Sequence, residues 1–244
     1  MARLYRARGI VLSFREMTER DRLIIVFTKA WGKKTLLAKG IKREGAKLRY
    51  RLNPYSVVEV ECVPGRSFDR VIAVNDVASL NDLLGEATRS LVTYSLALVV
   101  FDILETMGQE SDPEPELFEE AVAICQTLAD ITPSEWDFML VFMIFRLLFL
   151  SGVGVDLTRC VRSGAVKSPR FVLHLREGGL VSSSYADTRE GDMWLKSDEI
   201  ALLRAFQAGH FQRVVTPFLD DSTLADHLIQ MSFRYLEYQA SCTI

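Results

Sequence analysis

The sequence lacks the short motifs that mark most catalytic centres. No GxSxG, HExxH, GxxxxGK[ST] or GxGxxG pattern occurs, so neither a nucleophile elbow nor a phosphate-binding glycine loop is indicated. The three histidines, His174, His210 and His227, lie far apart along the chain. We therefore expect a protein that is not an enzyme. A hydrolase using Cys160 or a serine is an alternative, although no general base can be assigned to it.

Cysteine is scarce. Cys62, Cys125, Cys160 and Cys242 are widely separated and form no CxxC pair, so the spacing does not indicate a disulfide framework. The basic start, MARLYRARG, is not followed by the apolar stretch of a signal peptide. We expect a cytoplasmic protein in a reducing compartment.

A hydrophobic run long enough to span a bilayer is also missing. The most apolar stretch, residues 138–150, has 13 residues and contains Arg146, whereas a spanning helix needs about 20. A buried core helix without a membrane is expected. Burial of Arg146 requires a partner, which is either a nearby acid or the carboxylate of a peptide bound in an apolar groove. Phe142, Arg146 and Phe149 are the candidate residues of such a groove.

Charge is unevenly distributed. Residues 1–80 contain 17 Lys and Arg against 8 Asp and Glu, a net charge of +9, whereas residues 81–244 have a net charge of −12. This asymmetry favours a polyanionic partner for the first part. Mutual attraction of the two parts is the alternative, and both can hold together.

Five short strands are predicted in the first 80 residues. Segments rich in β-branched and aromatic residues are separated by turns at Trp31–Lys34, Asn53–Pro54 and Pro64–Arg66. This spacing favours a small closed barrel of the OB-fold type. We predict an α+β protein in which residues 1–80 form this barrel and residues 81–244 form a mostly helical domain.

The helical domain is predicted because apolar residues recur every three or four positions after Ala78. This period indicates one helix from Leu80 to Glu105 and further helices near residues 116–129, 197–206 and 221–239. Thr132, Pro133 and Glu135 are typical of a helix start. The helical period is interrupted in residues 156–195, for which we predict a small irregular insert with two short strands.

Basic side chains gather in the loops of the predicted barrel. Lys33 and Lys34 are placed on a turn, and six cations follow within the segment LAKGIKREGAKLRYR. Such side chains can follow a phosphate backbone, and Phe14, Trp31, Tyr50, Tyr55 and Phe68 offer stacking faces or pack the core. The candidate DNA-binding residues are Arg22, Lys33, Lys34, Lys39, Lys42, Arg43, Lys47, Arg49 and Arg51.

Several segments together resemble the bacterial DNA repair protein family RecO. Residues 9–43, GIVLSFREMTERDRLIIVFTKAWGKKTLLAKGIKR, resemble its opening. Leu52, Pro54 and Tyr55 match the LxPF/Y motif that follows in this family. Residues 145–165, FRLLFLSGVGVDLTRCVRSGA, resemble its apolar helix, glycine-containing turn and cysteine-bearing segment. Residues 177–180, EGGL, resemble its short return strand, so the resemblance spans nearly the whole chain.

The sequence departs from this family at a zinc site. Many members hold zinc with four cysteines in two CxxC pairs, whereas here only Cys160 remains, with Ser163 at the second position and Ser182–Ser184 at the second pair. A closed structural site needs four ligands, and the insert adds at best His174. We therefore expect a zinc-less insert and no cofactor.

The resemblance implies a recombination mediator. Such a protein binds single- and double-stranded DNA, anneals complementary strands and helps to load RecA onto DNA coated by single-strand-binding protein. The implied partners are RecR and the acidic C-terminal tail of single-strand-binding protein, with RecA as an indirect partner, and the implied location is the nucleoid. The alternatives are an RNA-binding OB-fold protein with a helical interaction domain and an adaptor that docks on an acidic protein.

Overall fold

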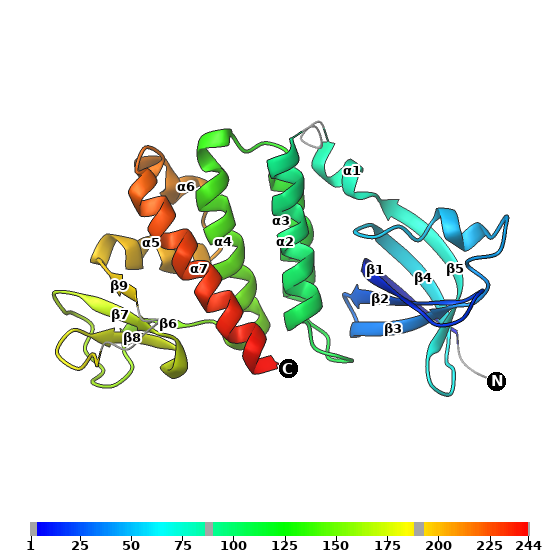
Figure 1. Cartoon of the computed structure of the whole chain (residues 1–244), viewed down its shortest axis with the longest axis horizontal. Coiled ribbons are helices and arrows are strands. Elements are labelled where there is room, and N and C mark those ends of the chain that lie inside the picture. The colour runs from blue at the N-terminus through cyan, green and yellow to red at the C-terminus, as the bar shows by residue number, and fades with distance from the viewer. Residues whose placement is uncertain (1–3, 86–89, 188–192, 244) are drawn as a thin grey trace. The chain divides into compact units, whose positions relative to one another are not determined.

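Five strands close into a barrel at the start of the chain, as the sequence predicts (Figure 1). They are β1 (Tyr5–Glu16), β2 (Arg22–Thr28), β3 (Gly32–Ala38), β4 (Val57–Val63) and β5 (Asp69–Ala78). Their order around the barrel is β1-β2-β3-β5-β4, with β1 paired to β4. The neighbours are antiparallel except for a short parallel contact of β3 with β5. This is the OB-fold arrangement expected from the sequence.

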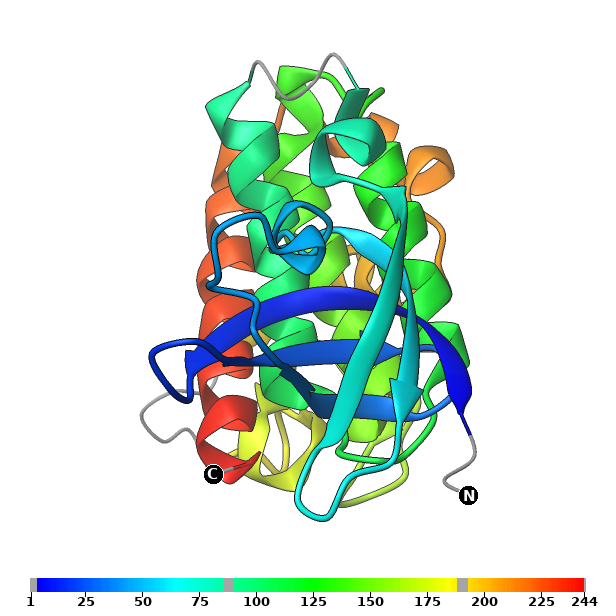
Figure 2. The ribbon, with the colours of Figure 1, turned by 90° about the vertical axis from the view of Figure 1, so that its right-hand side faces the viewer.

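The long strand β1 closes the barrel by pairing on both sides. Its first half pairs with β4 and its second half with β2, so the strand runs across the barrel (Figure 2). Gly9 belongs to both ladders. A Cβ atom at Gly9 would lie 2.5 Å from Cγ1 of Val26, so the close approach of the two strands requires glycine. The interior is filled by residues such as Val11, Ile24 and Val60, which are buried.

The computed structural model describes residues 4–85, 90–187 and 193–243, except for the side chains of Lys47, Asp76 and Thr243. The described chain divides into two units, residues 1–130 and 131–244. The first unit therefore contains the barrel together with α1 (Leu80–Leu84), α2 (Leu91–Met107) and α3 (Pro115–Thr127). A single helix from Leu80 to Glu105 is a wrong prediction, because α1 ends at Leu84 with Gly85 as its C-cap, and Ser90 caps a new helix.

The hairpin of β2 and β3 is fastened to the helices of its own unit. The Lys33 ammonium donates a hydrogen bond to the carbonyl of Glu105 at 2.7 Å, and the backbone of Lys33 pairs with Gln109 and Ser111. Phe27 stacks on Phe118 with ring centroids 6.4 Å apart. These contacts make α2 and α3 part of the barrel's packing.

The second unit is built around α4 (Trp136–Leu148), the apolar stretch of the sequence. Thr132 and Glu135 form the predicted capping box, with the Thr132 amide donating to the Glu135 carboxylate at 2.7 Å. Pro133–Val153 is long and apolar enough to cross a membrane, but most side chains of α4 are buried against its neighbours. These neighbours include α5 (Ser197–Gln207) and α7 (Ser222–Thr243), and α6 (Gln212–Val215) packs against α5.

The predicted insert with two strands is a four-stranded sheet. Its strands are β6 (Asp156–Cys160), β7 (Phe171–His174), β8 (Gly179–Ser182) and β9 (Met193–Leu195), in the order β6-β8-β7-β9. The prediction missed β6 and β9 because both are short edge strands without a clear alternation of apolar residues. They become strands by pairing with β8 and β7.

We predict that Gly32→Ala destabilises the first unit by more than about 2 kcal/mol. Gly32 has φ +63°, and an added Cβ atom would lie 2.1 Å from the carbonyl oxygen of Asp112. The left-handed conformation alone costs alanine about 1–2 kcal/mol, and the clash adds to that cost. Urea unfolding followed by circular dichroism measures the change.

Gly45→Ala is the matched control. Gly45 has φ +75°, but an added Cβ atom meets no atom within 4 Å. The Gly45→Ala variant should therefore lose only the stability that the left-handed conformation costs an alanine. Equal losses for the two variants would show that the close approach of Asp112 is not a constraint.

Candidate nucleic-acid interface

A hollow lined by cations and apolar side chains lies on the barrel where three connections meet. It has a volume of about 510 Å³ and is bordered by the end of β1, β3 and the turn between β4 and β5. We call it the cationic hollow. Its lining consists of Met17, Leu37, Lys39, Val63, Pro64, Gly65, Arg66, Ser67, Phe68 and Arg70.

The charge of the cationic hollow has one sign. Lys39, Arg66 and Arg70 are exposed at its edge, and none of the described residues that line it is acidic. Met17 and Phe68 add an apolar surface to the same lining. Such a lining can hold phosphate groups while an aromatic or thioether surface contacts a base.

Two further hollows continue this surface. One shares Ser67 and Phe68 with the cationic hollow and adds Arg15 and Lys34, among other residues. The other shares Lys39 and adds Arg20 and Arg43. These outer hollows also contain acids, including Asp69 and Glu19. The concentration of positive charge is therefore greatest in the middle.

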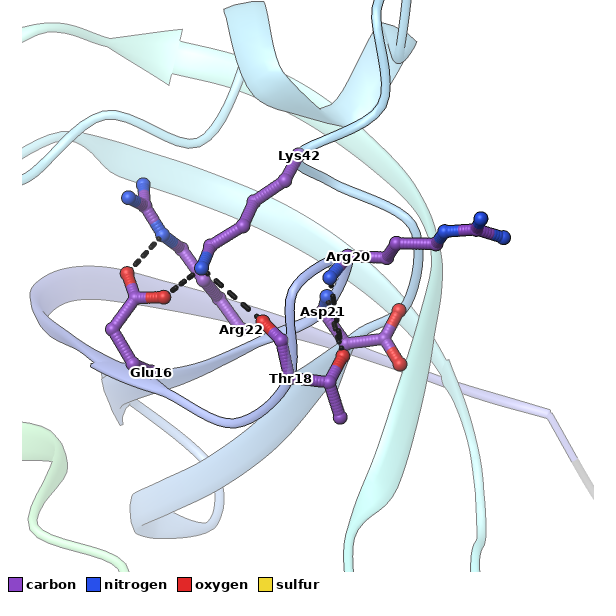
Figure 3. Close-up of polar contacts among 6 residues, drawn as sticks. All are labelled: Glu16, Thr18, Arg20, Asp21, Arg22 and Lys42. Carbon is purple, nitrogen blue, oxygen red and sulfur yellow. Dashed lines mark hydrogen bonds and ion pairs between the residues drawn. The ribbon is translucent and has the colours of Figure 1, made fainter.

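The turn between β1 and β2 is joined to the loop after β3 by a polar network (Figure 3). Arg22 Nε donates to Glu16 Oε1 at 2.8 Å, and Lys42 forms an ion pair with the other oxygen of Glu16. Thr18 Oγ1 accepts the backbone amides of Arg20 and Asp21. The Asp21 carboxylate accepts the amide of Gly40 at 2.6 Å. The bond between Asp21 and Gly40 fixes the backbone from which Lys39 extends.

Some of the predicted DNA-binding residues line the hollows, whereas others have partners within the protein. Lys34, Lys39 and Arg43 line the three hollows. Lys33 and Lys34 belong to β3 rather than to a turn, because Gly32 already pairs with Thr28. Lys33 also borders one hollow, although its ammonium is bound to α2.

The other predicted cations have internal partners or lie away from the hollows. Arg22 and Lys42 are paired with Glu16, and Arg51 donates to the carbonyl of Val74 at 2.8 Å. Arg49 is exposed on a 3-10 helix, Lys47–Tyr50, outside the linings of these hollows. The side chain of Lys47 lies outside the described residues.

Four exposed arginines that line the hollows are not among the predicted DNA-binding residues: Arg15, Arg20, Arg66 and Arg70. Arg66 and Arg70 come from the turn between β4 and β5, which the fold places beside the end of β3. The available signal was the OB fold itself, whose loops between strands 1 and 2 and between strands 4 and 5 border the ligand face.

The candidate stacking aromatics are mostly engaged in packing. Tyr55 stacks on Phe101 with centroids 4.9 Å apart, and Trp31 lies 5.7 Å from Tyr5. Phe14 lies under the guanidinium of Arg22 at 5.8 Å. Tyr50 is exposed, whereas Phe68 lies in the cationic hollow. Phe68 is therefore the aromatic best placed to meet a base beside cations.

Of the candidate peptide residues, Phe142 and Arg146 belong to α4, and Phe149 directly follows its last residue. Phe142 is 5% exposed and packs edge-on against Phe206, whereas Phe149 is 47% exposed. Arg146 Nη1 donates to the carbonyl of Gln207 at 2.6 Å. The guanidinium thus bonds to a backbone carbonyl of α5, which is neither of the carboxylate partners considered from the sequence.

Cys160 is buried at the end of β6 and accepts hydrogen bonds at its sulfur. Its Sγ lies 3.3 Å from the donating amide of Ser182. Burial raises the pKa of the thiol, but hydrogen bonds from Ser163 and Ser182 outweigh this effect and lower the pKa to about 6. These serines occupy the positions where the resemblance implies zinc ligands.

Among the described residues, metal ligands do not gather around Cys160. Within residues 4–85, 90–187 and 193–243, no group of three or more His, Cys, Asp or Glu residues is arranged to hold a metal ion. The absence of zinc from the purified protein stays a prediction.

Comparison with family models identifies the chain. The model for the recombination protein O N-terminal region matches residues 1–80, and the model for the C-terminal region matches residues 88–241. The chain belongs to the recombination protein O family. This is a family of DNA-repair recombination mediators and not a known enzyme family. The first match covers the barrel and with it most of the residues that line the three hollows.

We predict that a thiolate signal appears in the ultraviolet absorbance of the folded protein with a midpoint near pH 6. Burial raises the pKa of Cys62 to about 11 and that of Cys125 to about 12, so neither titrates in this range. Cys160→Ser should remove the transition. A thiolate signal that begins above about pH 8, the ordinary range of cysteine, would contradict the prediction.

Proposed function

We propose that the cationic hollow binds DNA and that the chain acts as a recombination mediator through it. The observation that supports this proposal is the placement of Lys39, Arg66 and Arg70 around Phe68, with no acidic residue among the described lining. Because lysine and arginine on loops read phosphate charge, binding should depend weakly on sequence. Both single- and double-stranded DNA can meet these requirements.

Annealing follows from the same chemistry. Complementary strands repel one another through their phosphates, and a basic surface that screens both strands lowers this repulsion. Because the proposed contacts engage phosphates more than base edges, the bases stay accessible for pairing. A protein of this kind would act in the cytoplasm at the nucleoid.

The second unit would supply protein contacts. We place the acidic C-terminal tail of single-strand-binding protein near Phe149 and Arg146, because the tail ends in an aromatic residue with a free carboxylate. Binding of the tail would bring the barrel to DNA that is already coated, where the chain, together with RecR, helps RecA to load.

Reversing the charge of the three cationic side chains that line the hollow should abolish most DNA binding. We expect the K39E R66E R70E variant to lose affinity at least tenfold and to show a shallower salt dependence, by about 0.7 in slope for each single-strand phosphate that is no longer neutralised. Fluorescence anisotropy with a labelled oligonucleotide over a series of salt concentrations measures both. Competition with RNA of equal length distinguishes the RNA-binding alternative.

The control variant is K167E R213E R234E, which makes the same charge change at exposed positions of the second unit. It should bind DNA nearly as the unmodified protein does. If both variants lose affinity equally, net charge rather than the cationic hollow determines binding.

Phe149→Ala should weaken binding of a peptide with the acidic tail sequence at least fivefold, because Phe149 is the exposed aromatic beside Arg146. Calorimetry measures the affinity. Phe233→Ala is the matched control, since Phe233 is also exposed, at 41%, but lies on α7. We choose Phe149 over Arg146 because the Arg146 guanidinium also holds the end of α5. Unchanged peptide binding in Phe149→Ala would place the tail elsewhere.

A further inference from the structure

Glu16 is an acid that binds two cations beside the proposed DNA surface. It ends β1 directly opposite Arg22, with which it pairs across the hairpin, and Lys42 reaches it from the loop after β3 (Figure 3). The Glu16 side chain is 61% exposed. Solvent, and therefore a phosphate group, can reach the site that the carboxylate occupies.

The two loops do not depend on Glu16 for their positions. The backbone amide of Lys42 donates to the carbonyl of Arg20 at 3.2 Å, and the amide of Gly40 donates to the Asp21 carboxylate. The Lys42 ammonium also donates to the carbonyl of Thr18 at 3.2 Å. The backbone of both loops would therefore stay in place without the carboxylate of Glu16.

The cations themselves also have a second support. The Arg22 guanidinium lies 5.8 Å from the ring centroid of Phe14, and Lys42 keeps its hydrogen bond to Thr18. Both charges would stay near their present positions after an exchange of anions. The role left to Glu16 is therefore electrostatic, because it neutralises charge that a phosphate would otherwise meet.

Exposed ion pairs of this kind are weak. Each contributes little to stability because solvent screens the charges, so a polyanion that offers several phosphates can displace the carboxylate. Nucleic acid must nevertheless compete with Glu16 for Arg22 and Lys42. The competition lowers affinity and reduces the number of cations that the free protein presents.

We propose that Glu16 is a built-in competitor of the DNA phosphate, which holds Arg22 and Lys42 in the free protein and is displaced from them on binding. It thereby sets the affinity and the salt dependence of the interface. This inference rests on the proposed DNA-binding function and adds to it a residue that limits binding.

The test is Glu16→Gln, which keeps the shape and hydrogen-bonding oxygen of the side chain but removes its charge. We expect about threefold to tenfold tighter binding of labelled single-stranded DNA, as two weak ion pairs no longer compete. The salt dependence should steepen by about 0.7–1.4 in slope, because up to two more cations take up phosphate. Anisotropy titrations at several salt concentrations give both values.

Glu44→Gln is the matched control. Glu44 is an exposed carboxylate in the loop after β3, lines none of the three hollows and takes no part in the ion pairs with Lys42 and Arg22. The two variants change the net charge equally, so a gain specific to Glu16→Gln supports the proposal. Equal or weaker binding by Glu16→Gln, while the unmodified protein binds DNA, would overturn the inference and leave the DNA-binding function standing.

A second comparison tests the link to Lys42. In a Lys42→Gln background, removing the charge of Glu16 should give a clearly smaller gain, because one of the two competing ion pairs is already gone. An undiminished gain would overturn the assignment of Lys42 as a partner in the competition. If neither the unmodified protein nor any variant binds DNA at low salt, the proposed function itself fails.

Discussion

Barrel closure is the constraint on which the candidate interface depends. Because β1 pairs with β4 at one end and β2 at the other, and β3 meets β5 through a short parallel ladder, the turn between β4 and β5 is brought beside the end of β3. Arg66 and Lys39 thus border one hollow although they are far apart in the sequence. The tight approach at Gly9 is a local condition for this closure.

Hydrogen bonds and ion pairs then decide which cations are available. Lys33 and Arg51 are bound to backbone carbonyls, and Arg22 and Lys42 are paired with Glu16. A basic segment of the sequence therefore contains residues that hold the fold together as well as residues that face solvent. The surface that remains most positive is smaller than the segment and lies partly on a different loop.

The strands, the barrel and the long apolar helix could be predicted from the sequence because local pattern determines them. The sequence predicts too few strands in the insert, because β6 and β9 become strands only through pairing with distant segments. The cations were predicted from their density along the chain, which favoured Lys47 and Arg49 over Arg66 and Arg70. The environment of Arg146 could not be predicted from the sequence either, because one of its partners is the backbone carbonyl of Gln207, 61 residues away.

The packing of Phe27 has a consequence for how this chain can be divided. The N-terminal family model ends at residue 80, yet Phe27 is completely buried and stacks on Phe118, and Lys33 is bound to the end of α2. A fragment that stops at residue 80 would leave an aromatic side chain uncovered and an ammonium group without its acceptor. The segment matched by the N-terminal family model is thus shorter than the segment that completes the hydrophobic packing of the barrel.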